Sequence, residues 1–300
     1  MSTQTKKLII LAGPTAIGKT ALAIQLARHF QTEIFSADSR QIYKEMTIGT
    51  AKPSPEELEL AKHHMINIVS IHDEWDVFQY EHRVIQKLER YFESNNIAIL
   101  VGGTGLYIKA VLEGLHAFPT VESEVLHKLE NQFADEGLGA LTAILKEADP
   151  EYHQIADLKN HRRVIRALSV IQSSGQKFSH FLQQDRPARS FTTTNITLVC
   201  DRSILYERIN SRVDQMIEHG LLAEVNQLQE YKDLKSLQTI GYKEIFNYLD
   251  GETDLNYAID KIKQHTRNYA KRQITWFSNN YDGLDSVSYT HLTLPTICSV

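Results

Sequence analysis

A phosphate-binding motif near the amino end constrains the fold of this chain more than any other feature. Residues 13–20 match the pattern G-x-x-x-x-G-K-[ST]. The apolar run before the motif, residues 8–12, is typical of a buried strand, and residues 21–30 after it have helical spacing. A glycine loop between a strand and a helix directs backbone N–H groups and the helix dipole at one anion. The motif therefore predicts a bound phosphorylated ligand, with a plain glycine turn as the alternative.

Two side chains of this loop have roles that follow from the motif. Lys19 is expected to place a positive charge on the outer phosphates, and the Thr20 hydroxyl is expected to bind Mg2+. The other contacts come from the loop backbone, so the whole motif is predicted to hold the ligand. Its residues are Gly13, Pro14, Thr15, Ala16, Ile17, Gly18, Lys19 and Thr20.

Composition excludes several classes of protein. The 300 residues, 42% hydrophobic and 23% charged, suit one large globular core or a core with an insertion. A formal charge of −5 argues against a uniformly basic nucleic-acid binder but allows a local basic face. Cys200 and Cys298 are too few for a disulfide framework or a zinc site, and no stretch is long and apolar enough to span a bilayer. We therefore expect a cytoplasmic protein that does not associate with membranes.

Three further apolar runs, residues 33–36, 97–101 and 196–200, are expected to be strands. Continuous apolar strands that alternate with helices are typical of a parallel sheet, whose ligands bind at the carboxyl ends of the strands. The sequence thus predicts an α/β fold, namely a P-loop NTPase-like core with a parallel sheet and an inserted helical domain.

Helical patterns interrupt the predicted core in the middle of the chain, where no strand is evident. We assign residues 1–115 and 195–285 to the core, and residues 116–194 to the helical insertion. The expected helices in the second half of the chain cover residues 122–136, 138–148, 160–173, 203–231 and 254–279.

The carboxyl-terminal residues differ in composition from the rest. Residues 286–300 contain no Lys, Arg, Asp or Glu and show no helical periodicity. This composition indicates a non-native tail, such as a translated cloning remnant, with a terminal strand as the alternative.

Asp38 and Thr104 are candidate catalytic residues because each closely follows a predicted strand. A carboxylate at Asp38 can take a proton from a nucleophile, bind Mg2+ or hold a ribose; an ordinary turn aspartate is the alternative. Thr104 lies among Gly102, Gly103 and Gly105, which allow a backbone to approach a ligand closely, whereas a helix cap is the alternative. The strand before Thr104 lacks a Walker-B aspartate and the chain has no N-K-x-D motif, which counts against an ordinary ATPase and a GTPase.

Two helical segments carry clustered basic residues. Arg162 and Arg166 are four residues apart and so share a helix face. Solvated helix faces are the usual explanation, but two such clusters in an acidic chain favour a phosphate-rich partner. The clusters are Arg162, Arg163 and Arg166, and Lys263, Arg267, Lys271 and Arg272.

Arg212 and the pair His63 and His64 also bear on the predicted site. Arg212 is a candidate charge clamp of the kind that phosphotransferases use, because it lies on the helix that follows a predicted strand. His63 and His64 are expected in a loop without a carboxylate or cysteine at metal spacing, so neither is predicted to be a ligand.

Several segments, taken in order, resemble the tRNA dimethylallyltransferase (tRNA isopentenyltransferase) family. The resemblance extends over residues 8–277, and this ordered set is far more specific than the phosphate loop alone. The matching segments are residues 13–20, 38–43, 48–53, 63–66, 102–107, 163–168, 240–244 and 266–277.

The resemblance implies transfer of a dimethylallyl group from dimethylallyl pyrophosphate to N6 of adenosine 37, in the anticodon loop of tRNA, with Mg2+. It implies that the phosphate loop holds the donor's pyrophosphate, that Asp38 is the general base, and that Thr104 and Arg212 position the donor. The target base would have to leave the loop stack to react. The implied tRNA contacts are Asp38, Ser39, Arg40, Gln41, Thr104, Arg162, Arg163, Arg166, Lys271 and Arg272.

This chain departs from the family pattern at two positions. Asn67 stands where the family often has Asp, and Leu126 stands where it often has Arg. The first change is expected to matter little, whereas the second bears on one tRNA contact.

Two other functions stay open. A small-molecule or nucleoside kinase would use the same phosphate loop, with the Arg162–Arg166 segment over ATP, but the missing Walker-B aspartate counts against it. An RNA-binding P-loop protein would use a nucleotide only as a switch, and the Asp38 and Thr104 pair counts against that. We expect a monomer, because nothing in the sequence requires a dimer.

Overall fold

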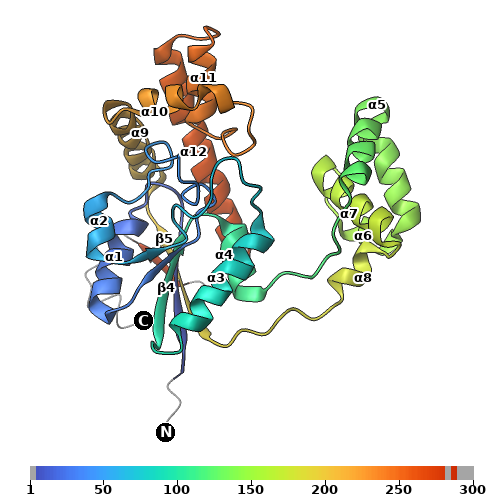
Figure 1. Cartoon of the computed structure of the whole chain (residues 1–300), viewed down its shortest axis with the longest axis horizontal. Helices are drawn as coiled ribbons and strands as arrows, with labels where there is room; N and C mark the ends of the chain where they lie inside the picture. Colours follow the sequence, from blue (N-terminus) through green and yellow to red (C-terminus); the bar gives the residue numbers. More distant parts are fainter. Residues whose placement is uncertain (1–4, 281–284, 289–300) are drawn as a thin grey trace. The chain divides into compact units, whose positions relative to one another are not determined.

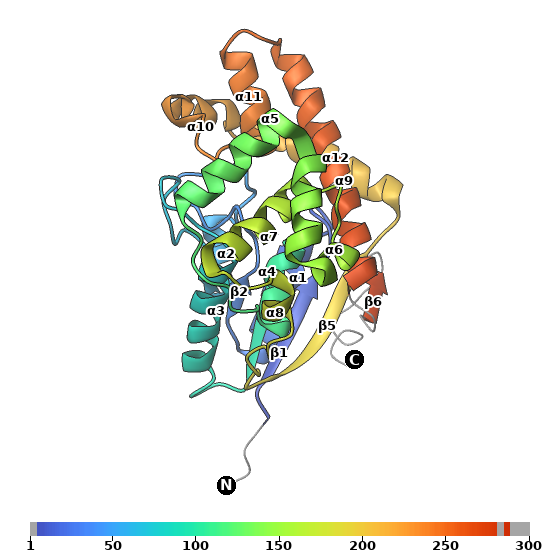
Figure 2. The same ribbon diagram turned by 90° about the vertical axis from the view of Figure 1, so that its right-hand side faces the viewer.

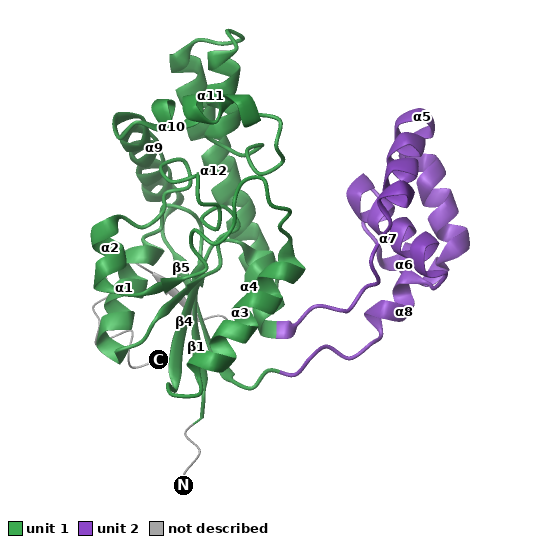
Figure 3. Ribbon diagram, viewed as in Figure 1, with its two compact units in different colours: residues 1–112, 189–300 green, residues 113–188 purple. Residues whose placement is uncertain are grey.

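The computed structural model describes residues 5–280 and 285–288 (Figure 1). The chain divides into two compact units, residues 1–112 with 189–300 and residues 113–188 (Figure 3). The first unit, unit 1, consists of two stretches of chain, so the second, unit 2, is an insertion within it.

Unit 1 is built on a parallel sheet in the order β3-β2-β4-β1-β5-β6. The strand that precedes the phosphate loop, β1, lies between β4 and β5, and its Lys7 is in register with Ile97 and Thr192. The predicted parallel α/β core is therefore confirmed. The strands are β1 (Lys7–Ala12), β2 (Ile34–Ser36), β3 (His63–His64), β4 (Ile97–Gly102), β5 (Thr192–Val199) and β6 (Asp285–Ser288).

The structure differs from the sequence-based expectation at three strands. His63 and His64 were expected in a loop but form β3, which pairs with β2 at the end of the sheet; two polar residues carry no alternation that would reveal a strand. β5 begins at Thr192, so the sheet resumes before residue 195. Residues 286–288 of the expected tail belong to β6, which pairs with β5, and the rest of that tail lies outside the described residues.

Helices of unit 1 follow the strands and pack on the sheet. The helix expected over residues 203–231 is divided, because Gly220 adopts a φ of 100° that a continuous right-handed helix cannot contain. The helices are α1 (Lys19–Phe30), α2 (Pro55–Leu60), α3 (Val77–Tyr91), α4 (Gly105–Glu113), α9 (Arg202–Glu218), α10 (Leu221–Gln227), the 3-10 helix η1 (Gln229–Tyr231), α11 (Tyr242–Leu249) and α12 (Leu255–Asn280).

β1 lies beside β5 in the sheet (Figure 2), and its apolar residues contribute to two cores, one on each face of the sheet. Ile9 and Leu11 belong to a cluster that includes the buried residues of α1, whereas Leu8 and Ile10 belong to one that includes those of α3. Because both faces are covered, the loops at the carboxyl ends of the strands are the places left for a ligand.

The described residues of unit 2 form helices and connecting loops without a strand, and they have their own apolar core, which includes Leu129, Leu141, Val164 and Leu168. Its longest helix is interrupted at Gly137, where the backbone leaves the helical region (φ 78°, ψ 178°). The helices are α5 (Ser123–Ala148), α6 (Pro150–Ile155), α7 (His161–Ser174) and α8 (Phe178–Leu182). No helix in the described part of either unit is long and apolar enough to span a bilayer.

Candidate active site

The phosphate loop joins β1 to α1 and holds its lysine against its own backbone. Gly18 takes the left-handed conformation at the start of α1 (φ 103°), which a side chain would strain. The Lys19 Nζ donates to the carbonyl oxygens of Gly13 at 2.9 Å and Pro14 at 2.7 Å. The ammonium group is thus placed inside the loop, where the motif predicts contact with phosphate.

Two half-buried cations meet at this loop. Burial, together with the positive charge of Arg212, lowers the pKa of Lys19 to about 7, while Asp38 acts in the opposite direction. Arg212, on α9, donates to the Thr15 hydroxyl at 3.4 Å, and burial lowers the pKa of its guanidinium as well. A polyanion between Lys19 and Arg212 would stabilise the charged form of both side chains.

Asp38 and Thr104 lie on neighbouring segments, after β2 and β4 respectively. Asp38 Oδ1 accepts hydrogen bonds from the backbone N–H groups of Arg40 at 2.8 Å and Gln41 at 3.3 Å. The Thr104 Oγ1 accepts from the Ser39 backbone N–H at 3.0 Å and lies 3.3 Å from the Ser39 hydroxyl. Asp38 is therefore held as a turn residue and also lines the pocket described next.

The pocket at the carboxyl edge of the sheet has two adjoining compartments within unit 1. The compartment at the phosphate loop has a volume of about 240 Å³ and is lined by Lys19 and Thr20. The larger one has a volume of about 550 Å³ and is lined by apolar side chains that include Met216 and Ile262. The residues that line both compartments are Thr15, Asp38, Thr50, Ala51, Arg212 and Tyr269. Asp38 and Arg212 thus face both spaces.

The glycines around Thr104 are required by packing within the protein. A Cβ at Gly102 would lie 2.2 Å from the Ala37 carbonyl oxygen, and one at Gly103 would lie 2.3 Å from Gln273 Nε2. A Cβ at Gly105 would lie 2.2 Å from Cε3 of Trp276. The sequence-based explanation, approach of the backbone to a ligand, is therefore incomplete, because side chains of α12 occupy this space.

Two residues of α12 belong to the site but were not predicted from the sequence. Tyr269 lines both compartments; burial and then the charge of Asp38 raise its pKa to about 12. Gln273 lines the smaller compartment and is 6% exposed. Their spacing with Trp276 places all three side chains on one helix face, which is the signal that could have identified them.

The residues expected to contact tRNA fall into two groups. Arg40 and Gln41 already bond within unit 1, where Arg40 donates to the Ser236 carbonyl at 3.1 Å and Gln41 to that of Ala51 at 3.1 Å. Asp38, Ser39 and Thr104 are also partly buried in unit 1. The exposed group consists of Arg162, Arg163 and Arg166 on α7 of unit 2, and Lys271 and Arg272 on α12 of unit 1.

The basic cluster of α12 is only partly available to a ligand. Lys263 forms an ion pair with Asp214 at 2.6 Å, and Arg267 donates to Asn210 Oδ1 at 2.6 Å. Both partners lie on α9, so this half of the cluster joins two helices of unit 1. Lys271 and Arg272 lie beyond these contacts and remain candidates for binding phosphate.

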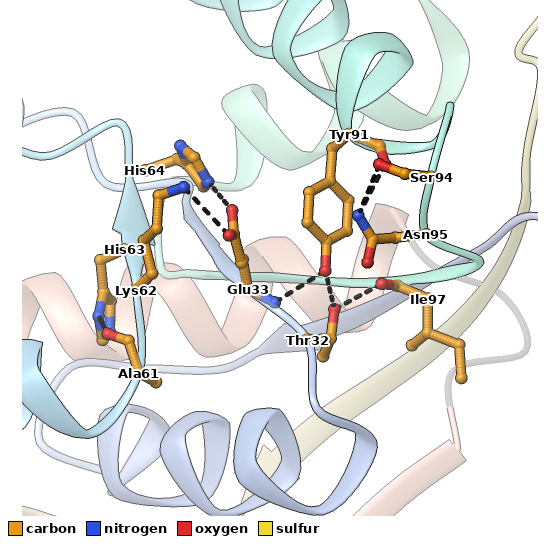
Figure 4. Close-up of polar contacts among 10 residues, drawn as sticks. All are labelled: Thr32, Glu33, Ala61, Lys62, His63, His64, Tyr91, Ser94, Asn95 and Ile97. Atoms are coloured by element: carbon orange, nitrogen blue, oxygen red, sulfur yellow. Dashed lines mark hydrogen bonds and ion pairs between the residues drawn. The ribbon is translucent and has the colours of Figure 1, made fainter.

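The two histidines of β3 have different surroundings. His64 Nε2 lies 2.5 Å from Glu33 Oε2 (Figure 4), and its ring stacks on Phe35. Glu33, immediately before β2, is thus a carboxylate partner of His64 that spacing along the sequence did not indicate. His63 Nδ1 lies 2.7 Å from the Ala61 carbonyl oxygen, and its side chain lines the smaller compartment.

Comparison with known proteins identifies the family. Residues 41–280 match the IPP transferase family. The chain belongs to this family. A relative from Christiangramia forsetii, a tRNA dimethylallyltransferase, is 50% identical over 270 residues, which cover 90% of this chain and 89% of the relative. The tRNA dimethylallyltransferase 1 of Bacteroides fragilis is 45% identical over 275 residues, covering 92% of this chain and 91% of the relative.

Solved structures of the family agree with the fold. The tRNA isopentenylpyrophosphate transferase of Bacillus halodurans superposes with a TM-score of 0.72 at 36% identity, covering 98% of this chain and 93% of that one. A eukaryotic dimethylallyltransferase acting on tRNA gives a TM-score of 0.81 at 29% identity, covering 95% of this chain and 74% of that one. The resemblance stated from the sequence is thus confirmed.

Proposed function

We propose that this chain transfers the dimethylallyl group of dimethylallyl pyrophosphate to N6 of adenosine 37 in tRNA. The observation that carries the proposal is the pair of adjoining compartments, one lined by the phosphate loop and the other larger and partly apolar, which share Asp38 and Arg212. Membership of the IPP transferase family supports the same reaction.

The smaller compartment suits the pyrophosphate of the donor. Lys19 and Arg212 supply two positive charges in a buried setting, where charge stabilisation is stronger than in water. As the bond between the allylic carbon and oxygen breaks, the electron pair leaves with the pyrophosphate, and both cations stabilise the negative charge that develops. Thr15 and Thr104 are proposed to position the donor.

Thr20 also fits a role in holding Mg2+. Its side chain lines the same compartment as Lys19, and Mg2+ commonly takes one or two protein ligands together with phosphate oxygens and water. No group of three or more His, Cys, Asp or Glu side chains able to hold a metal occurs among the described residues, so the ligand's phosphates would have to complete the shell. When bound, the ion would neutralise part of the pyrophosphate charge.

The larger compartment suits the flipped adenine. Asp38 lies where the two compartments meet, so its carboxylate is placed to accept the proton that the N6 amine loses as the new bond to carbon forms. The base must leave the anticodon-loop stack to reach this space. Exposed arginines on α7 of unit 2, with Lys271 and Arg272 of unit 1, are proposed to hold the tRNA backbone.

The residues that line both compartments come from unit 1, and we propose that the protein acts as a monomer. A tRNA substrate and the absence of a membrane-spanning helix from the described residues are consistent with the proposed location in the cytoplasm.

The test is transfer of label from radiolabelled dimethylallyl pyrophosphate to a tRNA with adenosines at positions 36 and 37, in the presence of Mg2+. Wild type should label adenosine 37. Asp38→Asn should reduce kcat by about 10²- to 10⁴-fold, because it removes the base but keeps an oxygen for the N–H groups of Arg40 and Gln41. Binding of tRNA should stay within about twofold in a filter-binding assay.

Two results would contradict the proposal. Absence of label together with phosphorylation of a small acceptor by ATP would favour the kinase. Equal activity of Asp38→Asn and wild type would remove Asp38 from the role of base.

A further inference from the structure

One face of α12 is fitted to the loop that carries Thr104. A Cβ at Gly103 would clash with Gln273, and a Cβ at Gly105 would clash with Trp276. Between these glycines, the Thr104 side chain hydrogen-bonds to Tyr269. Three consecutive loop residues are thus matched by three side chains of one helix, which fixes the loop against α12.

The side-chain amide of Gln273 joins this loop to the phosphate loop. Its Nε2 donates to the Gly103 carbonyl oxygen at 2.8 Å, and its Oε1 accepts from the Thr15 backbone N–H at 2.8 Å. One partner is an acceptor and the other a donor, so the orientation of the amide is set by its partners. An amide satisfies both partners at once, whereas a carboxylate can satisfy only Thr15.

The two partners of Gln273 belong to two different parts of the proposed site, the part that binds pyrophosphate and the part that contains the base. Thr15 belongs to the phosphate loop, and its hydroxyl accepts from Arg212. Gly103 precedes Thr104, whose hydroxyl accepts from the backbone N–H of Ser39, the residue after Asp38. Through these contacts, the Gln273 side chain connects the residues proposed to hold the leaving pyrophosphate with those proposed to deprotonate the amine.

We propose that Gln273 is a positioning residue that holds the phosphate loop at the distance from Asp38 and Thr104 that the reaction requires. This inference rests on the proposed prenyl transfer. Loss of Gln273 should therefore misalign donor and acceptor while leaving each able to bind, so kcat should fall and the dissociation constants should not change.

The first test is Gln273→Met, which keeps much of the side-chain volume but removes both hydrogen bonds. We expect kcat for labelled prenyl transfer to fall by about 10- to 100-fold. Dissociation constants for inorganic pyrophosphate and for tRNA should stay within about twofold. The control is Gln264→Met, at an exposed position on the same helix that lines neither compartment, and its kcat should equal that of wild type.

The second test is Gln273→Glu, compared at pH 6 and pH 8. The ionised carboxylate cannot donate to Gly103, but the protonated acid offers one donor and one acceptor, as the amide does. Burial raises the pKa of such a carboxyl group, so the ratio of variant to wild-type kcat should rise by about tenfold from pH 8 to pH 6. Because wild type is measured at both pH values, the effects of pH that both proteins share cancel in this ratio.

The outcomes separate this inference from the proposed function. If wild type transfers no prenyl group, the proposed function fails, and this inference fails with it. If wild type is active but Gln273→Met keeps its kcat, or the Gln273→Glu ratio does not depend on pH, only the positioning role is overturned. A purely structural role would lower the melting temperature and the active fraction without changing kcat per active site or producing this pH dependence.

Discussion

At the scale of single residues, the site contains two positive charges, on Lys19 and Arg212, that a bound anion would stabilise. Lys19 and Arg212 are both half-buried, burial lowers the pKa of each, and Lys19 folds back onto carbonyl oxygens of its own loop. Unpaired cations in such a setting favour binding of an anion, since the bound anion restores their charged forms.

Binding of pyrophosphate should therefore weaken as the pH rises. The pKa of Lys19 lies at about 7 in the protein, so the ammonium form is present below pH 7 and is lost above it. We expect the dissociation constant for inorganic pyrophosphate, measured by calorimetry at fixed Mg2+, to rise by about tenfold from pH 6 to pH 8. The same measurement on Lys19→Met corrects for protonation of the pyrophosphate itself, which also occurs with the variant. The expected rise of about tenfold is the difference between the two proteins. Parallel slopes for the two proteins would show that Lys19 does not titrate in this range.

Gly103 should not tolerate a methyl group. Its Cβ would lie 2.3 Å from Gln273 Nε2, so Gly103→Ala should displace Gln273 and lower kcat by at least about tenfold. The matched control is Gly139→Ala, because nothing lies within 4 Å of the added carbon and the position is in a helix. That control should stabilise the protein by up to about 1 kcal/mol, as measured by thermal unfolding. Full activity in Gly103→Ala would show that the contact can relax.

The sequence predicted the site unevenly at this scale. Lys19 and Thr20 follow from a local motif, and Asp38 and Thr104 from their places after strands; the structure puts all four on or beside one pocket. Gln273 and Tyr269 come from the other end of the chain, and only their helical spacing relates them to each other. Their contact with residues 15 and 103 depends on tertiary packing that no local pattern contains.

At the scale of elements, the loop after β2 is held in place from α10. The Glu224 carboxylate accepts hydrogen bonds from the backbone N–H groups of Thr47 at 3.1 Å, Ile48 at 2.7 Å and Gly49 at 3.1 Å. It also accepts from the Tyr242 hydroxyl at 2.6 Å. This loop then continues to residues 50 and 51, which line both compartments.

Glu224→Ala should therefore loosen one wall of the pocket. We expect the free energy of unfolding to fall by about 1–3 kcal/mol, because three backbone donors and one hydroxyl lose their acceptor. The KM for the prenyl donor should rise as well, as measured by label transfer. Glu218→Ala, an exposed position at the end of α9, should change neither quantity. Equal stability of the two variants would mean that solvent replaces Glu224 without loss.

Most elements could be predicted because they carry periodic apolar residues. The parallel strands β1, β2, β4 and β5 and the helices α1, α5, α7, α9 and α12 follow from such patterns, whereas α3 was not predicted. β3 could not, since it consists of two polar residues whose pairing with β2 depends on a neighbour nearly thirty residues earlier in the chain. Gly220 stands at the break between α9 and α10, but a glycine in the sequence does not by itself predict that a helix ends there.

At the scale of the whole molecule, the pocket proposed for the reaction and most of the arginines proposed to bind tRNA lie in different units. The pocket lies in unit 1, and the exposed arginines of α7 lie in unit 2. The sequence indicated an insertion through a change from strands to helices. Its limits were less visible, because residues 113–115 and 189–194 carry no pattern that assigns them to either unit.

The arginines of α7 should contribute to tRNA affinity and not to donor binding. Replacing Arg162, Arg163 and Arg166 with Ala should weaken tRNA binding at low salt and reduce the slope of log K against log salt by about 0.7 for each lost phosphate contact. Binding of inorganic pyrophosphate should not change. Filter binding at several salt concentrations measures the first quantity, and calorimetry measures the second.

The matched control removes three exposed lysines of the same unit, Lys128, Lys146 and Lys159. It makes the same change in net charge at positions outside the α7 cluster. If both triple variants lose tRNA affinity equally, binding depends on the overall charge of unit 2 and not on the α7 arginines.

The hydrogen bonds of Gln273 can form only late in the synthesis of the chain. The hydrogen bond to Thr15 joins positions 258 apart in the chain, so a ribosome completes the phosphate loop long before it adds the residue that fixes it. The sheet around β1 is likewise completed late, because β5 begins at Thr192. By the role proposed for Gln273, a chain that ends before α12 would lack the residue that fixes its phosphate loop and would be inactive in prenyl transfer.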